Sequence, residues 1–144
     1  IPSGGQDLFS SKLPALQAYQ LSLIAPPVPA GSFDAAAALR GKRGFYVAGQ
    51  CVTCHSGATY TDANSLLHPP SDSMAEPETP SYASRSATKL YRTSPLKGVW
   101  QHAPYFHDGS AATLADAVQA YNTKKSLGLS AQEVADVAEY LKSL

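Results

Sequence analysis

The segment from residue 57 to residue 110 carries almost no periodic pattern of apolar residues, and this constrains the fold more than any other feature of the sequence. Neither the 3.6-residue period of a helix nor the alternation of a strand can be followed through it. Prolines, which lack a backbone donor, interrupt it at Pro69, Pro70, Pro77, Pro80, Pro95 and Pro104. About 50 residues without regular structure are unusual in a compact domain. We therefore expect this part of the chain to wrap around something.

A short helix and a stiff connector are predicted at the start of the chain. Residues 13–24 place apolar side chains at helical spacing, and Pro14 lies near the start, where a helix tolerates it. The segment 25–31 is rich in proline, so it cannot continue the helix and forms a stiff connector. We therefore divide the chain into an N-terminal helix with its connector, 1–31, and a compact domain, 32–144.

Three further helices are predicted in the compact domain. Apolar residues recur at helical spacing in the segments 35–46, 113–122 and 131–144. Residues able to cap these helices precede each segment or begin it: Ser32 or Asp34, Thr113 with Asp116, and Ser130 with Glu133. Gly49 is placed to end the first. Because no convincing strand or hairpin is visible, the fold class is all-α.

Composition excludes two classes of partner. The chain has 144 residues, enough for about one domain, with 11 Lys plus Arg against 11 Asp plus Glu. A balanced charge argues against nucleic acid, for which a clustered basic surplus is expected. No stretch approaches the ~18 uninterrupted apolar residues of a membrane span. The first residue is Ile1, not Met, so we expect a processed chain or a fragment of a larger protein.

The pentapeptide Cys51-Val52-Thr53-Cys54-His55 is the motif that carries chemistry. Two thiols at this spacing can add to the two vinyl groups of one porphyrin, and the adjacent imidazole can then bind the iron. Covalent attachment of one c-type haem through Cys51 and Cys54, with His55 as proximal ligand, is therefore predicted. A buried porphyrin also explains the irregular segment, because the chain would wrap the cofactor.

Three other interpretations of the two cysteines remain open. A redox-active CxxC is expected near a βαβ pattern, which is absent here. A tetrahedral zinc site needs about four ligands, and the chain has only 2 Cys and 4 His to supply them. A local disulfide is the third alternative. Each would make the chain a binding module without haem.

The sequence resembles the class I c-type cytochromes at both ends of the compact domain. Gly41 and Phe45 are four residues apart before the haem motif, and Tyr140 lies in an amphipathic last helix. The resemblance covers 33–57 and 130–144. It implies that the two helices cross, with Ala38, Gly41 and Phe45 packed against Val137, Tyr140 and Leu141.

A narrower resemblance covers about 45–144. The segments 91–100 and 103–114 are similar to the C-terminal haem domain of bacterial dihaem cytochrome c peroxidases and of the related methylamine-utilisation haem enzyme. In those proteins this domain carries the six-coordinate, electron-transferring haem. They also have a second CxxCH, whereas this chain has one. The resemblance therefore favours an electron-transfer domain over a catalyst acting by itself.

The sixth iron ligand is open between several residues. Met74, the only methionine, lies in a polar loop after the motif and is the first candidate. Tyr121 is the second, because by resemblance it stands where the dihaem peroxidases place methionine and the methylamine-utilisation enzyme places tyrosinate. The other candidates are His68, His102, His107 and an open site.

Two residues are predicted to hold the haem propionates. Arg92 offers a charged fork to a carboxylate and Trp100 an indole donor, with Tyr91 nearby. The stretch between Glu78 and Asp108 contains four basic residues and no acidic one: Arg85, Lys89, Arg92 and Lys97. Such a basic stretch could guide an acidic redox partner.

The function predicted from these features is the relay of single electrons by a monohaem cytochrome c domain. Its partner is expected to be a redox protein or a fused redox domain. The resemblance implies a periplasmic or otherwise exported location, because covalent haem attachment takes place outside the cytoplasm. The alternative is a peroxidase-like domain whose distal site opens, with His107 as the distal acid-base group.

Overall fold

The structure, a computed structural model, describes residues 7–72, 74 and 85–144. Its regular elements are helical, and across the described part of the chain β-pairing is limited to isolated bridges, such as the one between His68 and Tyr91. The α-helices are α1 (Leu13–Ser22), α2 (Ala35–Arg43), α4 (Leu114–Lys125) and α5 (Ala131–Lys142). The short turns are η1 (Ser10–Lys12), η2 (Gly44–Ala48), η3 (Cys51–Thr53), η4 (Pro70–Asp72) and η5 (Val99–Gln101). The prediction of an all-α fold is confirmed.

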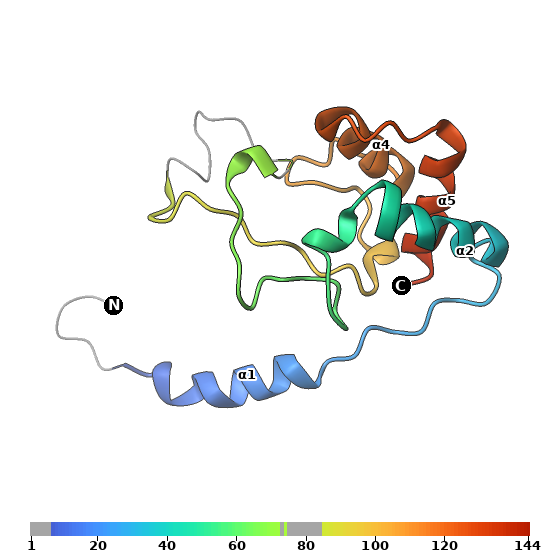
Figure 1. Cartoon of the computed structure of the whole chain (residues 1–144). Coiled ribbons are helices and arrows are strands. Elements are labelled where there is room, and N and C mark those ends of the chain that lie inside the picture. The colour runs from blue at the N-terminus through green and yellow to red at the C-terminus, as the bar shows by residue number, and fades with distance from the viewer. Residues whose placement is uncertain (1–6, 73, 75–84) are drawn as a thin grey trace.

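Helices α2 and α5 cross at Gly41 (Figure 1). A Cβ on Gly41 would overlap the backbone carbonyl of Asp136 and lie 2.8 Å from the nitrogen of Val137. Only glycine therefore permits this approach. One turn further on, the ring of Phe45 packs edge-on against that of Tyr140, with the centroids 5.3 Å apart. The predicted crossing of the two helices is thus present.

The predicted caps form at the helix starts. Of the two candidates for α2, Asp34 is the one that caps, because its carboxylate accepts from the backbone N–H groups of Ala36 and Ala37. Thr113 with Asp116 and Ser130 with Glu133 both form reciprocal capping boxes. Capping satisfies amide groups that a helix start would otherwise leave without partners.

Helix α2 does not end in an ordinary α-helical turn, as the sequence predicts, but passes into a wider π-helical turn. After Arg43 the chain continues into η2 as a π-helical turn, and the amide of Gly49 donates to the carbonyl of Gly44 at 2.7 Å. Gly49 ends this turn, as the sequence indicates. Single π-turns are frequent at functional sites, and this one leads directly to Cys51.

The hydrophobic core is formed almost entirely by the helical parts of the compact domain. Phe45 and Val137 are each 1% exposed and form its centre. The remaining core residues are Leu114, Val118, Leu129, Val134, Ala138, Tyr140 and Leu141. None of them comes from the irregular segment, whose Tyr60, Trp100 and Tyr105 only pack against this core from outside.

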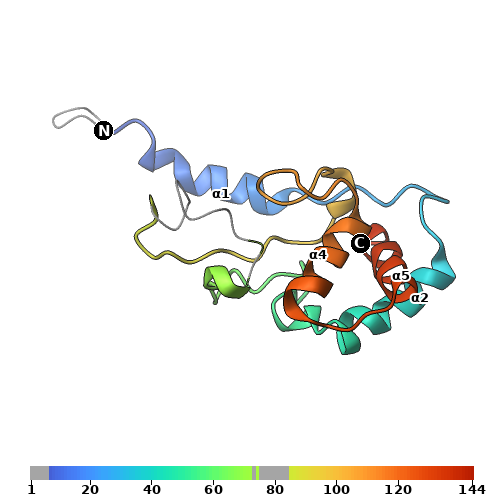
Figure 2. The same ribbon diagram turned by 90° about the horizontal axis from the view of Figure 1, so that it is seen from above.

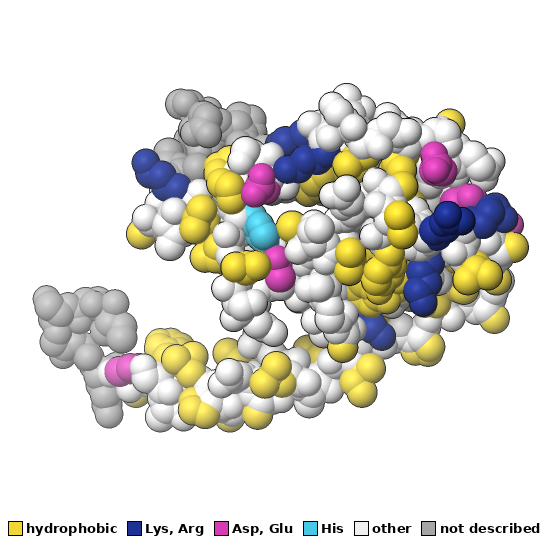
Figure 3. Space-filling model, in the orientation of Figure 1, with side chains coloured by type: hydrophobic (Ala, Val, Ile, Leu, Met, Phe, Trp, Pro, Cys, Tyr) yellow, Lys and Arg dark blue, Asp and Glu magenta, His cyan; other side chains and the backbone are white. Residues whose placement is uncertain are grey.

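The described part of the irregular segment forms an arch beside the helices (Figures 1 and 2). Its described part contains η4 and η5 and the antiparallel bridge between His68 and Tyr91, whose two backbone hydrogen bonds are 2.8 and 2.7 Å long. Between the arch and the helical body the surface is hollowed (Figure 3). The predicted irregular structure is therefore found, and it surrounds a hollow.

Helix α1 lies outside this body and joins α2 through the extended connector (Figure 1). None of its residues is buried. The predicted helix ends at Ser22, because Leu23 is extended with ψ of 128°. Among the described residues, no helix has the length and apolar character needed to cross a membrane.

Candidate functional site

The two cysteines and the histidine of the motif lie on one tight turn. Cys51 and Cys54 are half-buried and not joined by a disulfide. The amide of His55 donates to the carbonyl of Cys51 at 2.9 Å, which closes the turn. Burial raises the pKa of the Cys51 thiol to about 11, so this side chain is a neutral thiol near pH 7. The site therefore brings two thiols and one imidazole together.

Gly49 makes room for the first thiol. A Cβ at this position would lie 3.0 Å from Sγ of Cys51 and 3.1 Å from the carbonyl oxygen of Gly44. Gln50, the next residue, has φ of 48° and so turns the chain from the π-turn into η3. The glycine predicted as a helix stop thus also shapes the cysteine site.

His55 has the tautomer that a metal ligand requires. Its Nδ1 lies 3.1 Å from the carbonyl oxygen of Tyr60. A carbonyl can only accept, so the proton is on Nδ1 and the lone pair is on Nε2. Burial lowers the pKa of the imidazole, opposed by the carbonyls of Tyr60 and Ser94. A neutral histidine with one nitrogen held by a backbone carbonyl is a common arrangement for binding iron.

Tyr60 is a residue of this site that the sequence analysis missed. Its φ of 56° is left-handed, and its carbonyl accepts from His55 while its phenol lies 2.9 Å from that of Tyr140. It therefore ties the imidazole to the core. A non-glycine residue with this conformation is uncommon, and nothing in the sequence marks it.

The indole N–H of Trp100 is a buried donor that fits a bound haem. It lies in η5, and its Nε1 is buried without a hydrogen-bond partner in the described structure. An unsatisfied buried donor costs about 1–3 kcal/mol. A haem propionate is the type of acceptor that would satisfy it, as the sequence predicts. The residues present therefore fit the cofactor, whereas Arg92, the other predicted propionate partner, is exposed.

Both leading candidates for the sixth ligand lie together on α4 and the loop beside it. The phenol of Tyr121 accepts from the backbone N–H of Met74. Burial raises the pKa of this phenol. Its ring packs edge-on against Phe106, with centroids 5.9 Å apart. Met74 is half-buried.

The histidine candidates differ in their distance from the motif. Nδ1 of His68 lies 4.0 Å from Sγ of Cys54, and its Nε2 lies 2.8 Å from a carboxylate oxygen of Asp62. His102 is exposed, and the exposed His107 lies 4.0 Å from its neighbour Asp108. Of these three histidines, His68 is therefore the one for which contact with the cysteines is observed.

Asp62 is a second residue that sequence reasoning missed. It is only 8% exposed, and one of its oxygens is buried without a partner among the described residues. Burial alone would raise its pKa, but hydrogen bonds from Thr93 and His68 outweigh that effect and lower it. Donor atoms of Cys54, Asp62 and His68 lie within 4.8 Å of one another. This group could supply three of the four ligands that a zinc ion takes.

The zinc interpretation leaves much of the motif unused. It takes Cys54 but not Cys51, and it gives no role to the Nε2 lone pair of His55. The c-type haem uses both thiols and this imidazole. The donor set as a whole therefore fits haem better than zinc.

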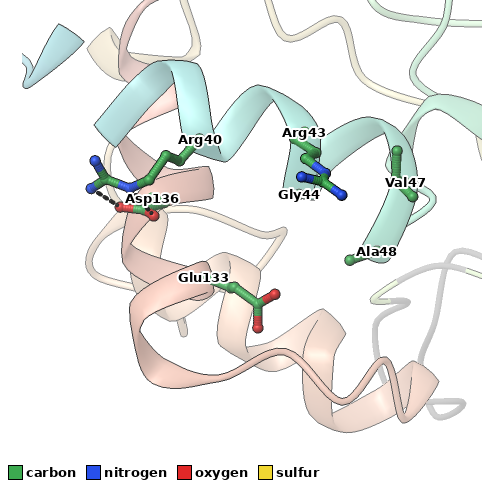
Figure 4. Close-up of a pocket in the computed structure, with 7 residues that line it drawn as sticks. All are labelled: Arg40, Arg43, Gly44, Val47, Ala48, Glu133 and Asp136. Atoms are coloured by element: carbon green, nitrogen blue, oxygen red, sulfur yellow. Dashed lines mark hydrogen bonds and ion pairs between the residues drawn. The ribbon is translucent and has the colours of Figure 1, made fainter. Parts of the chain in front are cut away.

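One surface cavity is separate from this site. It has a volume of about 400 Å³ and lies between the end of α2 and the start of α5 (Figure 4). At its edge Arg40 binds the carboxylate of Asp136 through two hydrogen bonds of 2.8 Å. None of the predicted site residues lines it.

Known proteins similar to this chain support the cytochrome c-like fold. Residues 90–126 match the family described as RoxA-like, cytochrome c-like. Cytochrome c551 peroxidase of Pseudomonas aeruginosa is 26% identical over an aligned length of 159 residues, gaps included. The alignment covers 99% of this chain and 46% of that protein. The structure of Kuenenia stuttgartiensis hydrazine synthase pressurised with xenon superposes with a TM-score of 0.65 at 26% identity, covering 94% of this chain and 55% of that one.

Fold, motif and comparisons define the class: the chain is a cytochrome c-like domain. More narrowly, it is related to cytochrome c551 peroxidase, of the dihaem peroxidase family, and to hydrazine synthase. It spans about half the length of these two relatives. The resemblance stated from the sequence is thereby confirmed.

Proposed function

We propose that this domain binds one c-type haem covalently through Cys51 and Cys54 and relays single electrons. The observation that carries the proposal is the hydrogen bond from Nδ1 of His55 to the carbonyl of Tyr60, on the turn that holds both thiols. It supports His55 as the proximal ligand because it leaves Nε2 with the lone pair. When bound, the haem supplies an iron that changes oxidation state by one electron.

The protein's own residues would hold and shield the group. Trp100 would donate its unpartnered N–H to a propionate, and the exposed Arg92 would contact a carboxylate from the solvent side. Met74 would be the sixth ligand, with Tyr121 as the alternative. The aromatic side chains of Phe45 and Tyr60, which pack together, would help to exclude water from the His55 side.

The proposed partner is a redox protein with an acidic face, or a fused redox domain. Support comes from Lys89, Arg92 and Lys97, which are exposed on a stretch without acidic residues between Glu78 and Asp108. Such a surface would steer an oppositely charged partner. The proposed location is exported or periplasmic, because covalent haem attachment takes place outside the cytoplasm.

Expression with the haem-attachment machinery of an exporting host tests the cofactor. We expect a Soret band that stays with the protein after acid-acetone extraction. Cys51→Ser and Cys54→Ser each leave one attachment point, and the double substitution leaves none. A chain that carries no covalent haem but binds one zinc ion, measured by metal analysis, would contradict the proposal and favour the group Cys54, Asp62 and His68.

The alternative function is a peroxidase-like domain with a distal site that opens. It is favoured by the similarity to a protein named as a peroxidase. Addition of cyanide or peroxide to the haem-loaded chain distinguishes the two. A sealed electron carrier binds neither rapidly, whereas rapid high-affinity binding would support the peroxidase.

Substitution distinguishes the two candidates for the sixth ligand. Met74→Ala should remove the long-wavelength absorption band of a thioether bound to ferric iron and lower the potential. Tyr121→Phe is the matched comparison, because it removes only the phenol oxygen. A spectrum that changes in Tyr121→Phe and not in Met74→Ala would assign the ligand to Tyr121.

A further inference from the structure

The donor atoms of Cys54, Asp62 and His68 form a cluster beside the haem motif. Sγ of Cys54 lies 4.0 Å from Nδ1 of His68, and Nε2 of His68 lies 2.8 Å from Oδ2 of Asp62. One donor atom of each residue lies within 4.8 Å of the other two. Sulfur, imidazole nitrogen and carboxylate oxygen are the three kinds of ligand that zinc takes in proteins.

The carboxylate of Asp62 has an oxygen left to bind something. Its side chain is 7% exposed, and that of the neighbouring His68 is 17% exposed. Oδ1 of Asp62 is buried without a hydrogen-bond partner among the described residues. A buried polar atom of this kind normally has a partner, so the unpaired oxygen points to a ligand at this position. A cation would satisfy it and balance its charge.

The backbone brings the carboxylate and the imidazole together. The carbonyl of Asp62 accepts from the amides of Ser65 and Leu66 at 2.9 and 3.0 Å, which makes a turn that returns the chain towards Asp62. His68 follows this turn and is fixed by its two backbone hydrogen bonds with Tyr91, 2.8 and 2.7 Å long. The cluster is therefore built by the main chain and does not depend on mobile surface side chains.

The spacing of the cluster is close to that of a tetrahedral site. Bonds of about 2.0–2.3 Å from zinc to nitrogen, oxygen and sulfur place the ligand atoms about 3.3–3.6 Å apart. Nε2 of His68 and Oδ2 of Asp62 are closer than this, at 2.8 Å, and Sγ of Cys54 lies within 4.8 Å of its two partners. Side-chain shifts of about 1 Å bring all three into range.

The chemistry of the three ligands selects a cation of the zinc type. A thiolate and a carboxylate together carry two negative charges, which a divalent cation neutralises in a partly buried site. Thiolate and imidazole disfavour Mg²⁺ and Ca²⁺, which prefer oxygen ligands. The other thiol of the motif is placed differently, because Sγ of Cys51 lies 3.5 Å from the carbonyl oxygen of Gly49.

We propose that Cys54, Asp62 and His68 bind one divalent cation of the zinc type in the chain before haem is attached, with water as the fourth ligand. Binding releases the thiol proton of Cys54 to solvent and transfers no electron. Attachment of haem converts the same sulfur into a thioether, so the cation must leave before that bond can form. The binding itself does not depend on the haem proposal; only this exclusion rests on it.

Titration of the haem-free chain with Co²⁺ tests the site, because cobalt takes the place of zinc and its spectrum reports its ligands. The chain is produced without the haem-attachment machinery and kept reduced with a phosphine. We expect a thiolate-to-cobalt charge-transfer band in the near ultraviolet that saturates at one cobalt per chain. Addition of Zn²⁺ should remove the band as zinc displaces cobalt.

Substitutions assign the ligands. Cys54→Ser should abolish the charge-transfer band, whereas Cys51→Ser should keep it. Asp62→Asn should weaken zinc binding at least about tenfold, and Asp108→Asn is its matched control because Asp108 is an exposed aspartate outside the cluster. Circular dichroism of each variant shows whether its helices are intact, so that a lost site is distinguished from an unfolded chain.

Three results of the titration would overturn the proposal. One is the absence of a charge-transfer band in a folded chain. Another is loss of the band in Cys51→Ser, which would mean that the two cysteines chelate the metal as a pair. The third is unchanged zinc affinity in Asp62→Asn, which would remove the carboxylate from the ligand set.

The exclusion of the cation by haem has its own measurement. The haem-loaded chain should bind zinc at least about tenfold more weakly than the haem-free chain, because the sulfur of Cys54 is then no longer a thiolate. Equal affinity would show that the cation does not use this sulfur and would overturn the proposal. A chain that takes up no haem would instead contradict the proposed function, and the cobalt titration would still decide the cation site.

Discussion

The phenol of Tyr140 is the most strongly perturbed tyrosine hydroxyl of the core. Burial raises its pKa far above the ordinary value, and the hydrogen-bonded phenol of Tyr60 at 2.9 Å raises it further. In the folded domain the phenol therefore stays neutral to a higher pH than an exposed tyrosine does. In the unfolded chain it ionises near pH 10.

Tyr140→Phe is predicted to change the alkaline stability of the domain. A raised pKa in the folded state contributes stability below the unfolded pKa of about 10, and this contribution is lost as the pH rises above it. The variant should lose about 1 kcal/mol near neutral pH, because the bond to Tyr60 is gone. Its urea midpoint should then fall less steeply than the wild type between pH 9 and about pH 11.

Tyr19→Phe serves as the control for that measurement, because Tyr19 is exposed on α1. Its midpoint should follow the wild type at every pH. Parallel slopes for Tyr140→Phe and the wild type would show that ionisation of Tyr140 does not limit alkaline stability.

Which site residues could be predicted from the sequence depended on whether their role rests on a local pattern. The motif Cys51-Val52-Thr53-Cys54-His55 is read directly, because its chemistry depends on sequence spacing. Tyr60 and Asp62 gave no such signal, since their roles arise from a left-handed backbone and from burial beside His68. Both properties exist only after the chain has folded.

At the scale of elements, the crossing of α2 and α5 depends on the missing side chain of Gly41. Gly41→Ala would force its methyl into the carbonyl of Asp136, which is backbone and cannot move away alone. We expect a loss of about 3 kcal/mol or more in the free energy of unfolding, although alanine is the better helix former. Thermal unfolding followed by circular dichroism measures it.

Lys42→Ala is the matched control, one residue further along the same helix and exposed. It should leave the melting temperature within a few degrees of the wild type. If Gly41→Ala were equally harmless, the close contact of α2 with α5 would be refuted.

The two capping boxes lead to a separate prediction for α4 and α5. Thr113→Ala and Ser130→Ala each remove a hydroxyl that accepts from the third residue of the helix. Each substitution should cost about 1 kcal/mol, and the two should add because the caps belong to different helices. Urea unfolding of the single and double variants checks both statements. The conservative variants Thr113→Ser and Ser130→Thr keep the capping hydroxyl, so they should retain most of the stability that the alanine variants lose.

The elements themselves were largely predictable from sequence, because caps and apolar spacing are local. The π-turn after Arg43 was not, since it replaces an ordinary helical turn where the chain bends towards Cys51. The burial of Asp136 was also unforeseen. It pairs with Arg40, a residue far away in the sequence, and is 6% exposed.

At the scale of the whole molecule, one half of the compact domain has a core of its own and the other does not. The helices enclose Phe45 and Val137, whereas the arch between residues 57 and 110 contributes no fully packed apolar cluster in its described part. The proposed haem would supply the missing apolar surface. Stability should therefore differ between the two halves when the cofactor is absent.

Hydrogen–deuterium exchange of the haem-free variant Cys51→Ser with Cys54→Ser tests this division. We expect the amides of α2, α4 and α5 to keep more protection than those of the arch, including Tyr91, whose amide donates to His68 at 2.7 Å. Covalent haem in the wild type should slow exchange in the arch by at least about tenfold. Equal protection of the arch in both forms would show that it folds without the cofactor.

The sequence by itself determined the all-α class, the helix starts and the pairing of thiols with an imidazole, because each depends on residues within one or two turns of one another. Only the tertiary structure decided which carbonyl holds His55, that Met74 and Tyr121 lie together, and that the large apolar residues of α1 are exposed. Such facts join segments that are far apart in the chain. Long-range packing sets them, and no local pattern records it.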